Sequence, residues 1–167
     1  MDLSGATSKI ENTVENVKKI YEKIKEKYNT AATKINHYID ELQQVIDKLI
    51  AAGEQAIEWA KMKIKKILKK ISDALDNLKK IINDKIEQLT KWYNESVKKV
   101  KINTVKGVYA KLGANITNEE AEPFADLIPH PKIESFISPI NIELQLPDID
   151  NLFNLNYSFE LGKLPLI

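Results

Sequence analysis

The chain of 167 residues contains no cysteine and no arginine, and these two absences limit the chemistry available to it. Without cysteine it can form neither disulfides nor thiolate metal sites, and it has no thiolate nucleophile. Without arginine it lacks the planar guanidinium group that binds phosphates and guanine edges through two parallel hydrogen bonds. We therefore expect no sequence-specific contact with nucleic acid.

Histidine is almost absent too, because His37 and His130 are the only two in the chain. One histidine with a neighbouring carboxylate does not complete a zinc coordination shell. The sequence also lacks the glycine-rich loops that hold phosphates and the GxSxG turn of serine hydrolases. We predict no catalytic, cofactor-binding or metal-binding residues, and a protein that is not an enzyme.

Long uncharged apolar runs are missing as well. The longest ones in this chain are far shorter than the roughly 20 residues needed to cross a bilayer. The first ten residues include Asp2 and contain no apolar stretch of signal-peptide length. We expect a soluble chain without a signal peptide or a transmembrane segment, and the sequence indicates no compartment.

Lysines and acidic residues are present in nearly equal numbers, but they are segregated along the chain. Residues 1–60 carry 8 lysines and 10 acidic residues, residues 61–111 carry 15 and 5, and residues 112–167 carry 2 and 9. A basic middle region favours an acidic binding partner. The acidic C-terminal third of the chain itself is one candidate for that partner.

Apolar residues recur every three or four positions through the first third of the chain, which is the pattern of an amphipathic helix. Ser8 and Glu11 have the spacing of a capping box at its start. The d positions of the heptad repeat hold the β-branched residues Ile10, Val17, Ile24 and Val45, which favour bundles of three or more helices over parallel dimers. We predict a homotrimer or a larger bundle, or an equal number of helices supplied by partner proteins. The predicted oligomer interface consists of Val14, Val17, Tyr21, Ile24, Tyr28, Ile35, Tyr38, Leu42, Val45 and Leu49.

The apolar repeat changes phase near Gly53 and then continues to about Leu112. This glycine is compatible with a continuous helix that contains a stutter, and with the turn of an antiparallel helical hairpin. We expect the continuous helix, since no Asn, Asp, Ser or Pro stands beside the glycine to build a turn. The fold class is therefore mainly α, a long helical rod or coiled coil over residues 1–112, with the hairpin as the alternative.

Beyond the rod the composition changes. Gly113 is suited to end a helix, and Thr117 with Glu120 forms a second capping box. All six prolines follow, which makes residues 113–139 a connector with one short helix. In residues 140–167 apolar and polar residues alternate, as in two short β-strands. We predict that these strands form a docking tail, because two strands alone are marginally stable in water. Its apolar face consists of Ile140, Ile142, Leu144, Leu146, Leu155, Tyr157, Phe159 and Leu161.

Two functions fit this organisation. A capped helical rod followed by a proline-containing tail with short strands is similar to small fibre, neck and baseplate subunits of virus particles. That resemblance implies a non-enzymatic structural subunit, in a virion or a tail-like particle, which oligomerises through the rod and docks through the tail. The alternative is a peripheral membrane protein, because residues 57–82 combine lysines with an apolar face as lipid-binding amphipathic helices do.

Overall fold

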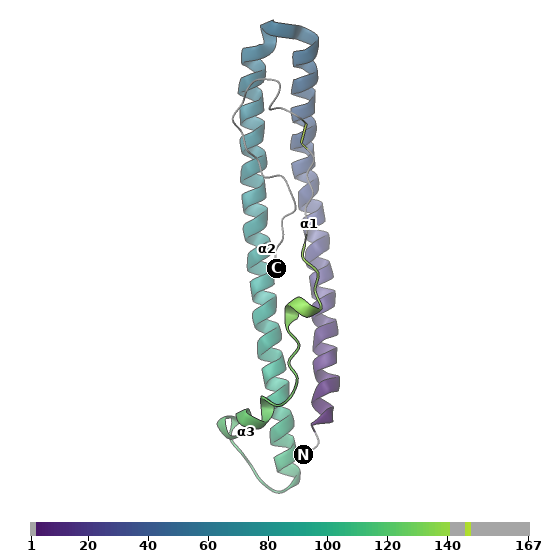
Figure 1. The fold of residues 1–167 in the computed structure, drawn as a ribbon, viewed down its shortest axis with the longest axis vertical. Helices are drawn as coiled ribbons and strands as arrows, with labels where there is room; N and C mark the ends of the chain where they lie inside the picture. The colour runs from purple at the N-terminus through teal and green to yellow at the C-terminus, as the bar shows by residue number, and fades with distance from the viewer. Residues whose placement is uncertain (1–2, 141–145, 148–167) are drawn as a thin grey trace. The chain divides into compact units, whose positions relative to one another are not determined.

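The computed structural model describes residues 3–140 and 146–147 (Figure 1). Of the described residues 85% are helical and none is in a strand, so the predicted mainly α class is confirmed. The two predicted strands fall almost entirely outside the described residues. The elements in chain order are α1 (Ser4–Ala52), the 3₁₀ turn η1 (Gly53–Ala56), α2 (Ile57–Lys111), α3 (Asn118–Ala125) and the 3₁₀ turn η2 (Ile133–Ser135).

The chain reverses direction at Gly53, which makes α1 and α2 an antiparallel hairpin (Figure 1). Helical residues follow one another over 108 positions, but Gly53 has a φ of 72°, in the left-handed region. Glycine adopts that region without the steric cost that a Cβ imposes. The expected continuous helix is therefore wrong and the hairpin alternative is correct. The glycine and the 3₁₀ turn Gly53–Ala56 build the reversal without an Asn, Asp, Ser or Pro.

Two glycines in the hairpin should respond oppositely to alanine. Gly53→Ala should lower the free energy of unfolding by about 1 kcal/mol, because φ at this position is positive. Gly107→Ala should raise it by roughly 0.5–1 kcal/mol, because Gly107 lies inside α2 and alanine is the better helix former. A Cβ added at either site meets no atom within 4 Å, so neither effect is a clash. Urea unfolding followed by circular dichroism measures both, and stabilisation by Gly53→Ala would contradict the left-handed turn.

Three helix ends were predicted from the sequence, and the structure agrees with two of them. Helix α1 begins at Ser4, so the predicted cap at Ser8 is wrong, and Ser8 lies inside the helix. The extra turn brings Ala6 into contact with the core, where it is fully buried, and its N–H donates to the Leu3 carbonyl at 3.1 Å. Burial of this apolar residue extends the helix beyond the local capping signal.

Helix α2 ends as predicted at a left-handed glycine, Gly113, with φ 82°. The Gly113 N–H donates to the Ala110 carbonyl at 3.0 Å, and the Ala114 N–H donates to the Tyr109 carbonyl at 2.9 Å. This pair of bonds is the Schellman arrangement, which satisfies carbonyls at a helix end. The predicted capping box at the start of α3 is confirmed, because Thr117 and Glu120 each accept a backbone hydrogen bond from the other.

The chain forms two compact units, and each combines segments from both long helices. Among the described residues, unit 1 comprises 3–24 and Asp84–Ser138, and unit 2 comprises Lys25–Asn83 with 139–140 and 146–147. This division differs from the one expected from the sequence. The expected regions are consecutive in the chain: residues 1–112, 113–139 and 140–167. Pairing of the start of α1 with the end of α2 places residues far apart in sequence in one core.

Unit 2 contains the hairpin turn and its core. Leucine and isoleucine dominate the buried set, and among the described residues of this unit no charged side chain is buried. Its buried side chains are Tyr28, Ile35, Leu42, Val45, Ile46 and Leu49 from α1, Ala60, Ile64, Ile67, Leu68, Ile71, Leu78 and Ile82 from α2, and Ile140.

Unit 1 adds a third layer to the helix pair, formed by α3 and by the proline-rich segment, residues 126–138. Isoleucines at intervals of four to five residues anchor that segment. The buried side chains are Ala6, Ile10, Val17 and Tyr21 from α1, Ile86, Leu89, Tyr93, Val97, Lys101 and Val105 from α2, and Ala121, Ala125, Ile128, Ile133 and Ile137 from the third layer.

Candidate functional site

A groove of about 440 Å³ lies between α1 and α2 within unit 2. The buried side chains of Ile35 and Leu78 line it together with the small side chains of Ala31 and Ala74. Ile81, which is 41% exposed, contributes an apolar wall. The groove therefore has core residues at its base and one exposed apolar side chain, Ile81, at its wall.

Polar side chains surround this groove. Lys34 from α1 and Lys70 from α2 line it together with Asp73 and Asn77. The Lys70 ammonium lies 5.8 Å from the centre of the Tyr38 ring, within the range of a cation–π interaction. Residues 25–83, which form the hairpin of unit 2, hold 12 lysines and 8 acidic residues. The groove therefore combines an apolar floor with a mainly basic surrounding.

The predicted oligomer interface lies largely inside the single chain. Seven of its ten residues are buried there: Val17, Tyr21, Tyr28, Ile35, Leu42, Val45 and Leu49. The other three, Val14, Ile24 and Tyr38, are half-buried. Burial raises the pKa of Tyr21 to about 12, and the neighbouring Glu22 carboxylate adds to the increase. The predicted apolar stripe thus packs α1 against α2, and only Ile35 and Tyr38 among its residues also line the groove.

The predicted docking tail is described at two positions only. Ile140 is buried and Leu146 is half-buried. The other six predicted tail residues, Ile142, Leu144, Leu155, Tyr157, Phe159 and Leu161, lie outside the described residues.

A cluster of aromatic and polar side chains attaches the proline-rich segment to α2 in unit 1. The Tyr93 hydroxyl donates to the Pro131 carbonyl at 2.6 Å. The Tyr93 ring meets the rings of His130 and Phe136 edge to face, with centroids 5.6 and 5.2 Å apart. A ring nitrogen of His130, Nε2, lies 3.0 Å from the Asn94 amide oxygen. The cluster holds an extended segment that the sequence alone indicated only as a connector.

The electrostatics of this cluster favour neutral groups. Burial, followed by the charge of Lys101, lowers the pKa of His130. Burial likewise raises the pKa of the Tyr93 hydroxyl, which remains a hydrogen-bond donor. Both shifts favour the uncharged forms of His130 and Tyr93, whose rings pack edge to face against each other, so the cluster has the properties of a packing contact.

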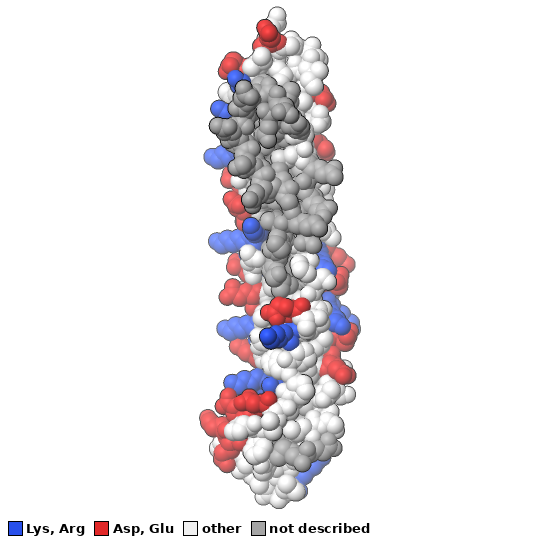
Figure 2. Space-filling view, in the orientation of Figure 1, with Lys and Arg blue, Asp and Glu red and all other residues white. Residues whose placement is uncertain are grey.

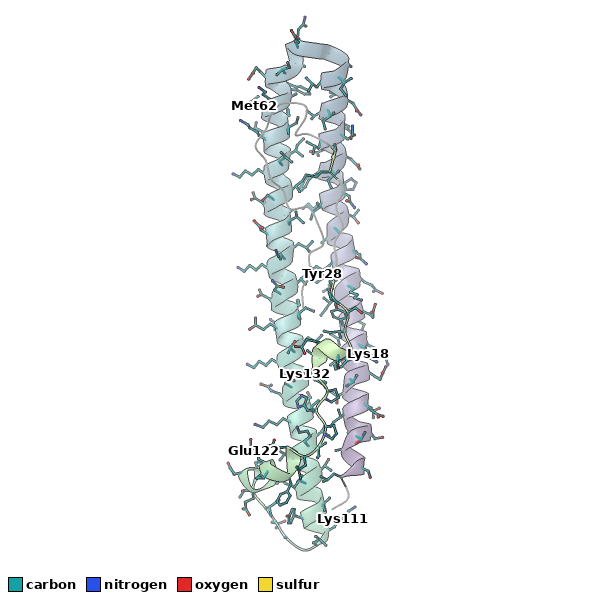
Figure 3. All side chains as sticks on the ribbon, viewed as in Figure 1. Lys18, Tyr28, Met62, Lys111, Glu122 and Lys132 are labelled. Carbon is teal, nitrogen blue, oxygen red and sulfur yellow. The ribbon has the colours of Figure 1, made fainter. Side chains whose placement is uncertain are left out.

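The lysine-rich start of α2 presents its apolar side to α1. Ala60, Ile64, Ile67, Leu68 and Ile71 are all buried, so this face is closed to lipid in the folded hairpin. Trp59 is 36% exposed and Met62 is 53% exposed; Met62 lies on the outer side of α2 (Figure 3). Lysine side chains project from the outer edge of α2 among acidic ones (Figure 2). No helix in the described part of the chain is long and apolar enough to cross a membrane.

Within residues 3–140 and 146–147, no three His, Asp or Glu side chains come together in a way that could hold a metal ion. No protein-family model, curated protein sequence or solved structure matches the chain.

Proposed function

We propose that this protein is a non-enzymatic structural subunit, which joins copies of itself or partner proteins into a larger assembly through its C-terminal tail. The observation that carries this proposal is the open apolar groove in unit 2 within a basic hairpin, in a chain that ends in an acidic, apolar segment. An apolar groove with an exposed isoleucine at its wall and lysines around it resembles the apolar centre and polar rim of a protein–protein contact.

The composition of the tail supports this role. Residues 148–167 contain 10 apolar residues, 3 acidic residues and 1 lysine. A segment this short buries too little apolar surface by itself to offset the backbone entropy of ordering. Packing against another surface would supply the missing burial, and the acidic groups match the basic hairpin. A virion or tail-like particle is one setting for such a subunit.

The test is the molar mass of the full chain in solution, measured by light scattering from low to high micromolar concentration. We expect trimers or larger species in the wild-type protein. Leu155→Asp with Phe159→Asp places two carboxylates on the apolar side of the predicted strand and should give monomers. Asn156→Asp with Ser158→Asp adds the same charge on the other side and should leave assembly nearly intact. A wild-type protein that stays monomeric throughout would contradict the proposal.

The membrane alternative uses residues 57–82, and the exposure of Trp59 and Met62 beside lysines is the observation in its favour. The seven buried residues of the same stretch would have to leave the hairpin core to meet lipid. Pelleting with vesicles that contain anionic phospholipid tests this function directly. Binding that Met62→Asp abolishes, with no self-association of the wild type, would favour the membrane role over assembly.

A further inference from the structure

We propose that the groove between α1 and α2 of unit 2 is the acceptor site for the C-terminal segment, residues 148–167, of a second copy of this chain. This inference rests on the proposed assembly function and names the two surfaces that meet. Most of the apolar stripe of α1 is buried against α2 within the hairpin. Contact between copies therefore requires another apolar surface. The groove provides one, with Ile81 exposed at its wall.

The apolar face of the C-terminal segment is similar in length to the α2 wall of the groove. The predicted apolar face from Leu155 to Leu161 spans about 20 Å when extended, at roughly 3.3 Å per residue. The α2 wall of the groove, from Lys70 to Ile81, spans about 16 Å at 1.5 Å per residue. An extended segment can therefore place three of these apolar side chains, Leu155, Tyr157 and Phe159, along the groove and keep its polar residues outward. Ala31 and Ala74 leave room for these larger side chains.

The charges of the groove and of the C-terminal segment are complementary as well. Lys34 and Lys70 line the groove from opposite helices against one acidic residue, Asp73, and the incoming segment carries Asp148, Asp150 and Glu160 against a single lysine. Opposite charges steer association and fix the register of a bound segment. A contact in which the tail of one copy enters the groove of the next is heterologous, so it produces a closed ring or an open filament. Either product is a suitable framework for a structural assembly.

Two variants of the full chain separate the donor from the acceptor. The acceptor variant carries Lys34→Glu with Lys70→Glu, and the donor variant carries Leu155→Asp with Phe159→Asp. Both lysines are exposed, so their reversal should leave the fold intact, and thermal unfolding by circular dichroism verifies this. The matched control is Lys48→Glu with Lys65→Glu, two exposed lysines on the same helices outside the groove, with the same change in net charge.

Light scattering then gives a distinct pattern. We expect the acceptor and donor variants to be monomeric when alone and to form a 1:1 complex when mixed, because one intact tail then meets one intact groove. The control should assemble like the wild type, and added salt should weaken the 1:1 complex.

Three outcomes would overturn the inference. If the acceptor variant assembles as well as the control, copies meet through another surface, and only the groove assignment fails. If the two variants remain monomeric when mixed, the tail does not act between copies. If the wild type itself is monomeric, the proposed function fails together with the groove assignment.

Discussion

Replacing Leu42 by aspartate is expected to destabilise the helical hairpin by about 3–5 kcal/mol, a large share of the 5–15 kcal/mol that typically separates folded from unfolded proteins. Leu42 is 0% exposed in the core of unit 2. The new carboxylate would be buried among leucine and isoleucine side chains without a partner, so it would have to be protonated or expose the core. Urea unfolding followed by far-UV circular dichroism measures the loss.

Gln44→Asp is the matched control, because Gln44 lies two residues further along α1 and is exposed. It adds the same charge to the same helix and should change stability by about 0.5 kcal/mol or less. Equal unfolding midpoints for Leu42→Asp and Gln44→Asp would show that Leu42 is not a core residue.

The same experiment separates a core within one chain from a core between chains. A core within the hairpin gives a urea midpoint that is independent of protein concentration in the monomeric tail variant, Leu155→Asp with Phe159→Asp. The interface predicted from the sequence, with Leu42 between copies, requires a midpoint that rises with concentration, since association stabilises the folded state by mass action. A rising midpoint that the tail variant Leu155→Asp with Phe159→Asp leaves unchanged would therefore assign the contact to α1.

The helices were predictable because their apolar repeat and their end signals depend on residues that are close together in the sequence. The recurrence of apolar residues from Val14 to Leu49 identifies both the helix and its inward face. The end of α2 was predictable for the same reason, since Gly113 and the Thr117–Glu120 pair act on neighbouring backbone groups. Periodicity also indicates which residues are covered. It does not indicate whether the covering helix belongs to the same chain.

The direction of the chain after Gly53 was not predictable from its neighbours. A single residue with positive φ is enough to reverse a helix, and the sequence around it is compatible with both outcomes. The groove depends on that reversal, because it places Ala31 and Tyr38 beside Ala74 and Ile81. Only the hairpin pairing of α1 with α2 brings these residues together, so no local pattern could reveal the site.

The position of the proline-rich segment was also beyond local signals. Its prolines favour an extended backbone but do not specify what it packs against. Tyr93 stands 38 residues before Pro131, which accepts its hydrogen bond. The pairing depends on the fold of unit 1, where isoleucines of the segment and the aromatic cluster are buried against the helices.

Tyr93→Ala is expected to lower the free energy of unfolding by about 3–5 kcal/mol, the usual cost of removing a large buried aromatic side chain. Tyr93 is 0% exposed and contacts both His130 and Phe136 edge to face. Tyr93→Phe keeps the ring and removes only the hydrogen bond to the Pro131 carbonyl, so it should cost about 1 kcal/mol. The difference between the two variants measures the packing of the ring separately from the hydroxyl.

Trypsin cleavage provides a second measurement, which reports locally on the release of the proline-rich segment from α2. Trypsin can cut after Lys132 only when the segment leaves α2, so cleavage there should be much faster in Tyr93→Ala than in Tyr93→Phe. Trp92→Ala is the control, because the neighbouring Trp92 ring is 44% exposed and lies outside the cluster. Its removal should cost less stability than Tyr93→Ala, because the side chain is only partly buried, and should leave cleavage after Lys132 close to wild type. If Trp92→Ala and Tyr93→Ala behave alike, the segment is held by something other than the Tyr93 cluster, and the third layer of unit 1 owes its stability to the buried isoleucines.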